Sequence, residues 1–187
     1  MMPNRRILCV LAAAFAVVAC GGIPLRSLPK LSRLGATLLE ADPADFAVAN
    51  QVDKRMLVSA DAAPVLLFKV SGGDAKSFPS LDRRLPLHLS SDPPHTLPPP
   101  GAGRIWLVYS LTRASQQEVL RLREALRGAK LSAGATVSVG LEQEGLAAQN
   151  PTLASTEWSS WIRTSRDEGF FELWSGKTGD LLNHADK

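Results

Sequence analysis

Six short segments of this chain are rich in apolar residues and are separated by clusters of turn-forming residues, a pattern typical of β-strands. Clusters of Asp, Gly, Ser and Pro separate the segments, among them 61–64, 71–74 and 92–103. The proline-rich break at 92–103 is predicted to be a rigid surface loop, with a polyproline II ligand for a partner as the alternative. The six predicted strands are Phe46–Val52, Val65–Val70, Leu85–Leu89, Ile105–Leu111, Ala135–Leu141 and Phe170–Trp174.

A period near 3.6 residues predicts an amphipathic helix over Ser115–Gly128. Ser115 followed by Glu118 has the pattern of a capping box, and Gly128 is a typical C-terminal stop. The apolar face that we expect to pack on the sheet consists of Val119, Leu122, Ala125, Leu126 and Ala129.

Leucines at helical spacing predict a second, shorter helix near the N-terminus, with Pro29 close to its start and Ala41 close to its end. Arg26, Lys30 and Arg33 follow each other there at spacings of four and three residues. They form either a basic stripe that rests on anionic phospholipid or a solvated helix face, and we favour the solvated face.

The segment from Trp158 to Thr164 fits both a helical turn and a strand, and we favour a strand in a hairpin that turns at 166–169. These elements together predict an α+β fold. We expect an antiparallel β-sandwich-like domain with one inserted amphipathic helix and a short N-terminal helix. The single globular domain is expected to span 45–187, after a tether and short helix at 20–44.

The first twenty residues have the composition of an export signal. Arg5 and Arg6 precede an unbroken apolar run from Ile7 to Val18, which is shorter than the roughly 20 residues needed to span a bilayer. Val17-Val18-Ala19-Cys20 ends this run and resembles the lipobox of bacterial lipoproteins. An ordinary secretory signal with Ala19 at its cleavage site is the alternative.

The lipoprotein resemblance covers only 1–22 and implies that residues 1–19 are a signal peptide. In that class Cys20 takes a diacylglyceryl group on its thiol, and the new terminal amine is acylated after cleavage. Gly21 follows the cysteine where an aspartate would favour inner-membrane retention, so the resemblance implies the periplasmic face of the outer membrane. Inner-membrane anchoring and surface exposure stay open.

Removal of 1–19 from the 187 residues leaves 168, enough for one domain with a substantial core. Without Arg5 and Arg6, the 21 basic residues fall to 19 against 18 acidic ones, a net charge near +1. We therefore expect no nucleic-acid partner. The resemblance implies that Cys9 is removed with the signal and that Cys20 is acylated, so we expect no disulfide, no thiol catalysis and no cysteine-based zinc site in the mature domain.

Other catalytic signatures are incomplete. The three histidines are scattered and lack metal-ligand spacing, so no metal and no cofactor are expected. Residues 174–178 resemble the end of a phosphate-binding loop, but Phe171 stands where that loop needs glycine, and we expect no nucleotide. Glu142 and Glu144 could share a strand face as a catalytic pair, yet no apolar pocket is indicated that would keep one protonated.

Two surfaces are candidate partner contacts. On a regular strand, Phe170, Glu172 and Trp174 point to one side, and two rings flanking a carboxylate suit a protein partner or a sugar. Arg123 and Arg127 line a polar face of the predicted helix as a basic stripe. The alternatives are core packing for the aromatic residues and a solvated face for the arginines.

The resulting expectation is an outer-membrane lipoprotein that faces the periplasm and is not an enzyme. Its domain would bind or scaffold another protein of the cell envelope, and its lipid would join it to the membrane. The alternative functions are a periplasmic hydrolase and a module that binds cell-wall glycan.

Overall fold

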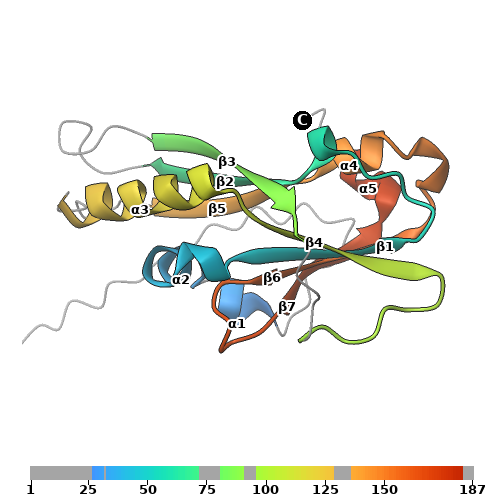
Figure 1. Cartoon of the computed structure of the whole chain (residues 1–187), viewed down its shortest axis with the longest axis horizontal. Coiled ribbons are helices and arrows are strands. Elements are labelled where there is room, and N and C mark those ends of the chain that lie inside the picture. The colour runs from blue at the N-terminus through green and yellow to red at the C-terminus, as the bar shows by residue number, and fades with distance from the viewer. Residues whose placement is uncertain (1–26, 32, 72–80, 91–95, 129–135, 183–187) are drawn as a thin grey trace, which may run out of the picture.

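Seven antiparallel strands form one sheet in the order β5-β2-β3-β4-β1-β6-β7 (Figure 1). The computed structural model describes residues 27–31, 33–71, 81–90, 96–128 and 136–182. The strands are β1 (Ala47–Asp53), β2 (Val65–Ser71), β3 (Leu81–Leu89), β4 (Arg104–Leu111), β5 (Thr136–Glu142), β6 (Glu157–Arg163) and β7 (Phe171–Lys177). The helices are α1 (Leu28–Leu31), α2 (Leu34–Glu40), α3 (Arg113–Gly128), α4 (Glu144–Ala148) and α5 (Thr178–Leu182), with 3₁₀ turns at Pro43–Asp45, Ala60–Ala62 and Pro151–Leu153.

The predicted α+β class and antiparallel strands are confirmed, and the sheet curls around its core (Figure 1). Each of the six predicted strands is present, although Ala135 at the expected start of one of them lies outside the described residues. The largest differences are that β7 continues to Lys177 rather than Trp174 and that β3 begins at Leu81 rather than Leu85. Leu81 is followed in β3 by three charged residues, Asp82, Arg83 and Arg84, and the backbone of all four pairs with β2. Strand pairing through the backbone needs no apolar side chain, so the hydrophobic pattern did not reveal this extension.

The favoured hairpin interpretation of 158–164 is confirmed. β6 pairs with both β1 and β7, and the turn before β7 contains Gly169 at φ 65°. A left-handed backbone of this kind favours glycine because it has no Cβ. The alternating burial of β6 places Trp158, Ser160 and Ile162 inside the molecule.

The predicted amphipathic helix exists as α3, but its predicted capping box is wrong. The helix begins at Arg113, directly after β4, and the Thr112 hydroxyl accepts a hydrogen bond from Ser115 N at 3.1 Å. The Ser115 hydroxyl donates to Pro86 O at 2.8 Å, and Glu118 instead forms an ion pair with Arg83 at 3.0 Å. An N-cap threonine three residues earlier therefore replaces the predicted serine.

The main core lies on the concave side of the curled sheet. Val119, Leu122 and Leu126 of α3 are buried in it as predicted, whereas Ala125 is exposed and Ala129 lies outside the described residues. The predicted N-terminal helix is divided into α1 and α2, and α2 lies beside α3 (Figure 1). Among the described residues, no helix is both long and apolar enough to span a membrane.

Candidate functional site

The outer face of the sheet carries a second, separate group of apolar side chains. Side chains alternate between the faces of a strand, so Val48 and Val52 of β1 point into the main core while Ala47 and Ala49 point to the opposite side. Ala49 pairs with Val108 of β4 and with Trp161 of β6. These neighbours extend the apolar group across three adjacent strands. We call Leu97, Trp106, Trp161 and Phe170, which pack on this floor, the outer aromatic cluster.

Two tryptophans form the centre of the outer aromatic cluster. The rings of Trp106 and Trp161 meet edge to face, with centroids 5.8 Å apart and an interplanar angle of 85°. This geometry is favourable for aromatic pairs because the positive edge of one ring meets the negative face of the other. The indole Nε1 of Trp106 donates a hydrogen bond to Pro98 O at 2.9 Å, so part of the proline-rich loop is held against the cluster. The four side chains of the outer aromatic cluster are partly exposed to solvent, whereas Ala47, Ala49 and Val108 beneath them are buried.

Arg163 links Phe170 to this cluster. Its guanidinium lies 5.0 Å from the Phe170 ring centroid, a cation–π contact, and its Nε donates to Asp45 O at 3.0 Å. Arg163 pairs with Ala47 across β1 and β6, so it lies on the same outer face. The turn before β7 thus brings a third aromatic ring to the cluster.

The expected common face of Phe170, Glu172 and Trp174 is wrong. The pairing of β6 with β7 shifts between Ser160 and Trp161, so Trp161 pairs with Glu172 while Ser160 pairs with Trp174. Such a β-bulge adds one residue to β7 and places Leu173 and Trp174 on the same side, against the main core. Phe170 and Glu172 remain on the side of Trp161. A single-residue insertion in the pairing cannot be read from the period of the side chains.

Trp174 lies across Gly176, two residues further along β7. A Cβ added to Gly176 would lie 2.5 and 2.8 Å from Cζ2 and Cη2 of the Trp174 ring. We expect Gly176→Ala to lower the free energy of unfolding by about 1–3 kcal/mol, because the ring must move out of its packed position. Urea unfolding of the two proteins, wild type and variant, measures this change.

Gly140→Ala on the edge strand β5 is the matched control, because an added Cβ there would meet its nearest atom, Leu67 Cβ, at an ordinary 3.7 Å. The control is expected to alter the stability by less than about 1 kcal/mol. Equal losses for the two variants would contradict the close packing of Trp174 on Gly176.

The two arginines of the predicted basic stripe lie on α3, away from the outer aromatic cluster. Arg123 is half-buried and donates from its guanidinium to Ala41 O, which ties α3 to the end of α2. Arg127 is exposed and forms an ion pair with Glu124 at 3.2 Å. Because α3 packs on the concave side of the sheet, the structure does not bring these arginines together with Phe170 or Glu172.

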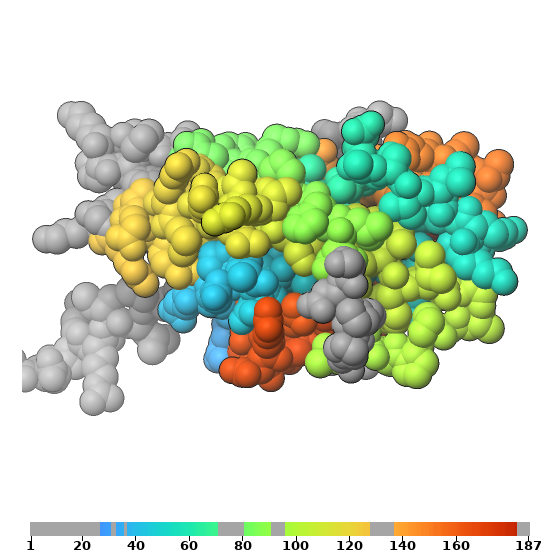
Figure 2. Space-filling view, in the orientation of Figure 1, coloured from blue at the N-terminus to red at the C-terminus, as the bar shows by residue number. Residues whose placement is uncertain are grey.

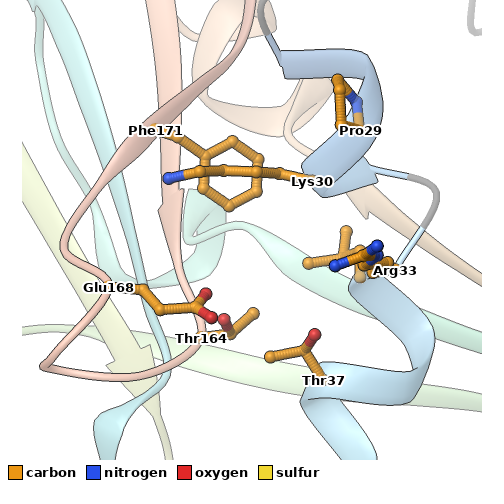
Figure 3. Close-up of a pocket in the computed structure, with 8 residues that line it drawn as sticks. Pro29, Lys30, Arg33, Thr37, Thr164, Glu168 and Phe171 are labelled. Atoms are coloured by element: carbon orange, nitrogen blue, oxygen red, sulfur yellow. The ribbon is translucent and has the colours of Figure 1, made fainter.

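A cavity of about 300 Å³ lies between the N-terminal helices and the β6–β7 hairpin (Figure 3). Figure 2 shows the two walls side by side on the surface, with α2 next to the hairpin. Lys30 lies over one wall, its Nζ 5.1 Å from the centroid of the Phe171 ring. The lining residues are Pro29, Lys30, Arg33, Leu34, Thr37, Thr164, Glu168 and Phe171. Sequence reasoning identified the spacing of Lys30 and Arg33 but not the cavity, because its second wall is more than a hundred residues away.

The clear pKa shifts lie outside the cavity and the outer aromatic cluster. A hydrogen bond from the Arg55 side chain holds the pKa of Asp53 well below its usual range. Burial raises the pKa of the Tyr109 phenol to about 12. Glu142 forms an ion pair with Arg84 at 2.6 Å, and this hydrogen bond raises the pKa of Arg84. Within the described ranges, no three His, Cys, Asp or Glu side chains gather closely enough to hold a metal ion.

Comparisons of this chain with protein-family models, with curated proteins and with solved structures find no match.

Proposed function

We propose that this chain is an outer-membrane lipoprotein, anchored through Cys20, whose periplasm-facing domain is a non-enzymatic binding module for another envelope protein. The observation that carries this proposal is the outer aromatic cluster on the convex side of the sheet. We also propose that the domain is sandwich-like. In this proposal, the partner covers the outer face of the sheet, where the outer aromatic cluster lies.

The composition of the outer aromatic cluster supports a protein partner. Tryptophan and arginine are the residues that most often dominate the binding free energy of protein interfaces, and Trp161 lies here beside Arg163 and Phe170. Each of these three side chains is half-buried and retains solvent-exposed surface. Ala47 and Ala49 beneath them are small, which lets the rings lie close to the sheet.

The chain's own proline-rich loop illustrates which chemistry the cluster accepts. Leu97 packs on the apolar group, and Pro98 offers its carbonyl to the Trp106 indole. Aromatic grooves that bind extended proline-rich segments combine the same two contacts. We therefore expect the partner to contribute an extended segment with apolar side chains and accessible carbonyl groups.

Lipidation supports this role because it raises the effective concentration of the module beside other membrane components. Restricting two binding partners to one surface strengthens their association without any new contact. The lipobox at 17–20 and Gly21 are the residues on which this part of the proposal depends.

Affinity purification from gently solubilised membranes tests the partner surface. Trp161→Ala is expected to reduce recovery of the partner by at least about tenfold, because truncation of a central tryptophan typically costs 2 kcal/mol or more of binding free energy. Leu57→Ala is the matched control, since Leu57 is 72% exposed and lies outside the cluster. Thermal unfolding of both variants checks that they are folded.

Recovery of the same proteins by wild type and Trp161→Ala, or of none by either, would contradict the proposed partner surface. A photo-cross-linking residue at position 170 provides an independent readout, and we expect a discrete adduct there but not from position 57. Co-sedimentation with purified cell wall that is lost in Trp161→Ala would instead assign the outer aromatic cluster to glycan binding.

A further inference from the structure

The cavity beside α1 and α2 has walls from two distant parts of the chain (Figure 3). Lys30 and Arg33 come from the N-terminal helical region, whereas Thr164 and Glu168 come from the end of β6 and the turn that follows it. Figure 3 shows Glu168 pointing towards Thr164 on one side, with Arg33 and Lys30 on the other. Two basic groups and one carboxylate thus line a single opening.

Two of the charged groups at this opening, Arg33 and Glu168, form no ion pair with the described part of the chain. Among the arginines in the described ranges, Arg33 and Arg113 alone have neither an ion pair nor a side-chain hydrogen bond, and of these two only Arg33 lines the cavity. Within the same ranges Glu168 has no ion-pair partner either. Seven of the eleven arginines in the described ranges form ion pairs with acids of the chain, whereas the guanidinium of Arg33 and the carboxylate of Glu168 remain available to a ligand.

The remaining lining groups complete a site for a small polar ligand. The hydroxyls of Thr37 and Thr164 contribute both donors and acceptors, and Thr164 is only 3% exposed. The ring of Phe171 lines the cavity as an apolar wall, and the Lys30 ammonium lies over this ring. A volume of about 300 Å³ is at the lower end of the range for ligand sites, which suits a head group better than a large molecule.

The position of the cavity along the chain connects it to the membrane. Pro29 on its rim follows Cys20 by nine residues, so even a fully extended link reaches only about 30 Å. An acylated Cys20 would therefore keep the opening close to the lipid head groups.

We propose that this cavity binds the head group of a membrane phospholipid that carries both a phosphate and a primary ammonium, as phosphatidylethanolamine does. Arg33 and Lys30 bind the phosphate through charge-assisted hydrogen bonds, and the carboxylate of Glu168 accepts from the ammonium. The threonine hydroxyls bind the remaining phosphate oxygens. The inference rests on the proposed membrane anchoring, and its consequence is a fixed orientation of the domain on the bilayer.

NMR titration of the mature chain in non-ionic detergent micelles tests this assignment. Dihexanoyl-phosphatidylethanolamine is expected to shift the signals of Arg33 Nε–H and of the Thr164 amide with saturation. Dihexanoyl-phosphatidylglycerol lacks the ammonium and dihexanoyl-phosphatidylcholine lacks an ammonium hydrogen, so both are expected to bind at least threefold more weakly. Inorganic phosphate is expected to bind weakest, because it makes only part of these contacts.

Matched variants separate the two halves of the site. Arg33→Gln is expected to raise the Kd for dihexanoyl-phosphatidylethanolamine at least tenfold, whereas Arg113→Gln, at the other arginine without a partner, leaves it unchanged. Glu168→Gln is expected to abolish the preference for phosphatidylethanolamine over phosphatidylglycerol. Asp167→Asn, one residue away and outside the cavity lining, retains that preference.

Equal effects of Arg33→Gln and Arg113→Gln, or no saturable shift in the wild type, would overturn the site. Equal affinities for inorganic phosphate and the phospholipids would reassign it to free phosphate and overturn the lipid assignment. These titrations require neither the outer aromatic cluster nor acylation of Cys20. Failure of the proposed partner binding and failure of the head-group site can therefore be distinguished.

Discussion

Replacement of Cys20 by serine is expected to abolish acylation and to remove the protein from the outer-membrane fraction. A hydroxyl is not the thiol that the lipobox resemblance requires, and the resemblance implies that signal cleavage follows lipidation. Each buried methylene of an acyl chain contributes about 0.8 kcal/mol to membrane binding, so several chains form an effectively stable anchor. Mass spectrometry of the N-terminus, together with membrane fractionation, measures both consequences.

Cys9→Ser is the matched control for this prediction. Cys9 lies only three residues after Arg6, with no apolar segment before it, so the same substitution there is expected to leave acylation and fractionation unchanged. A wild-type protein recovered as soluble material with an unacylated N-terminus would contradict the anchor and, with it, the proposed location of the module.

Trp158→Ala is expected to give the largest loss of stability among substitutions in the core. The side chain is 1% exposed, and its Nε1 donates to Ser160 Oγ at 2.9 Å. Ser160 is also hydrogen-bonded to the buried Gln143, so the substitution leaves a cavity beside a weakened polar network. We expect the free energy of unfolding to fall by about 3–5 kcal/mol, a large part of the about 5–15 kcal/mol typical of a domain.

Trp158→Phe separates the cavity from the hydrogen bond. It keeps most of the ring volume but loses the indole N–H, so we expect a smaller loss of about 1–2 kcal/mol in the same denaturant titration. A loss for Trp158→Ala no greater than that for Trp158→Phe would show that the surrounding core closes over the missing ring, contrary to its tight packing.

The β6–β7 hairpin separates the two proposed sites. Phe170 belongs to the outer aromatic cluster, while its neighbour Phe171 lines the cavity. Arg163 at the end of β6 contacts Phe170 of the cluster, while Thr164, the next residue, lines the cavity. Adjacent residues on extended backbone point to opposite sides, so one hairpin presents a partner surface and a head-group site in different directions.

Local patterns predicted the elements well and their ends less well. Apolar segments separated by turn-forming residues identified all six expected strands, and helical spacing identified α3 with its buried Val119 and Leu122. The predicted N-cap of α3 was wrong because Ser115 and Glu118 have the pattern of a capping box. In the structure β4 ends at Leu111, so Thr112 is the first residue that can cap the helix. Which residue caps a helix depends on where the preceding strand ends, and that is decided by pairing across the sheet.

The candidate site was predictable only in part. The concentration of aromatic residues near the C-terminus is visible in the sequence, but Trp106 joins them through the pairing of β4 with β1 and of β1 with β6. Likewise, Arg33 and Glu168 are separated by more than a hundred residues and line one cavity only because the hairpin folds against the N-terminal helices.

By itself, the sequence predicted the strands and the long helix, and it contains the lipobox-like residues at 17–20 on which the proposed lipidation rests. These features depend on short-range spacing, which the covalent chain sets directly. Only the tertiary structure decided that Trp174 packs inward while Trp106 and Trp161 meet on the outer face, and that a cavity opens beside Lys30. A one-residue bulge reverses the side to which the residues after it point, and strand pairing, rather than local periodicity, places that bulge.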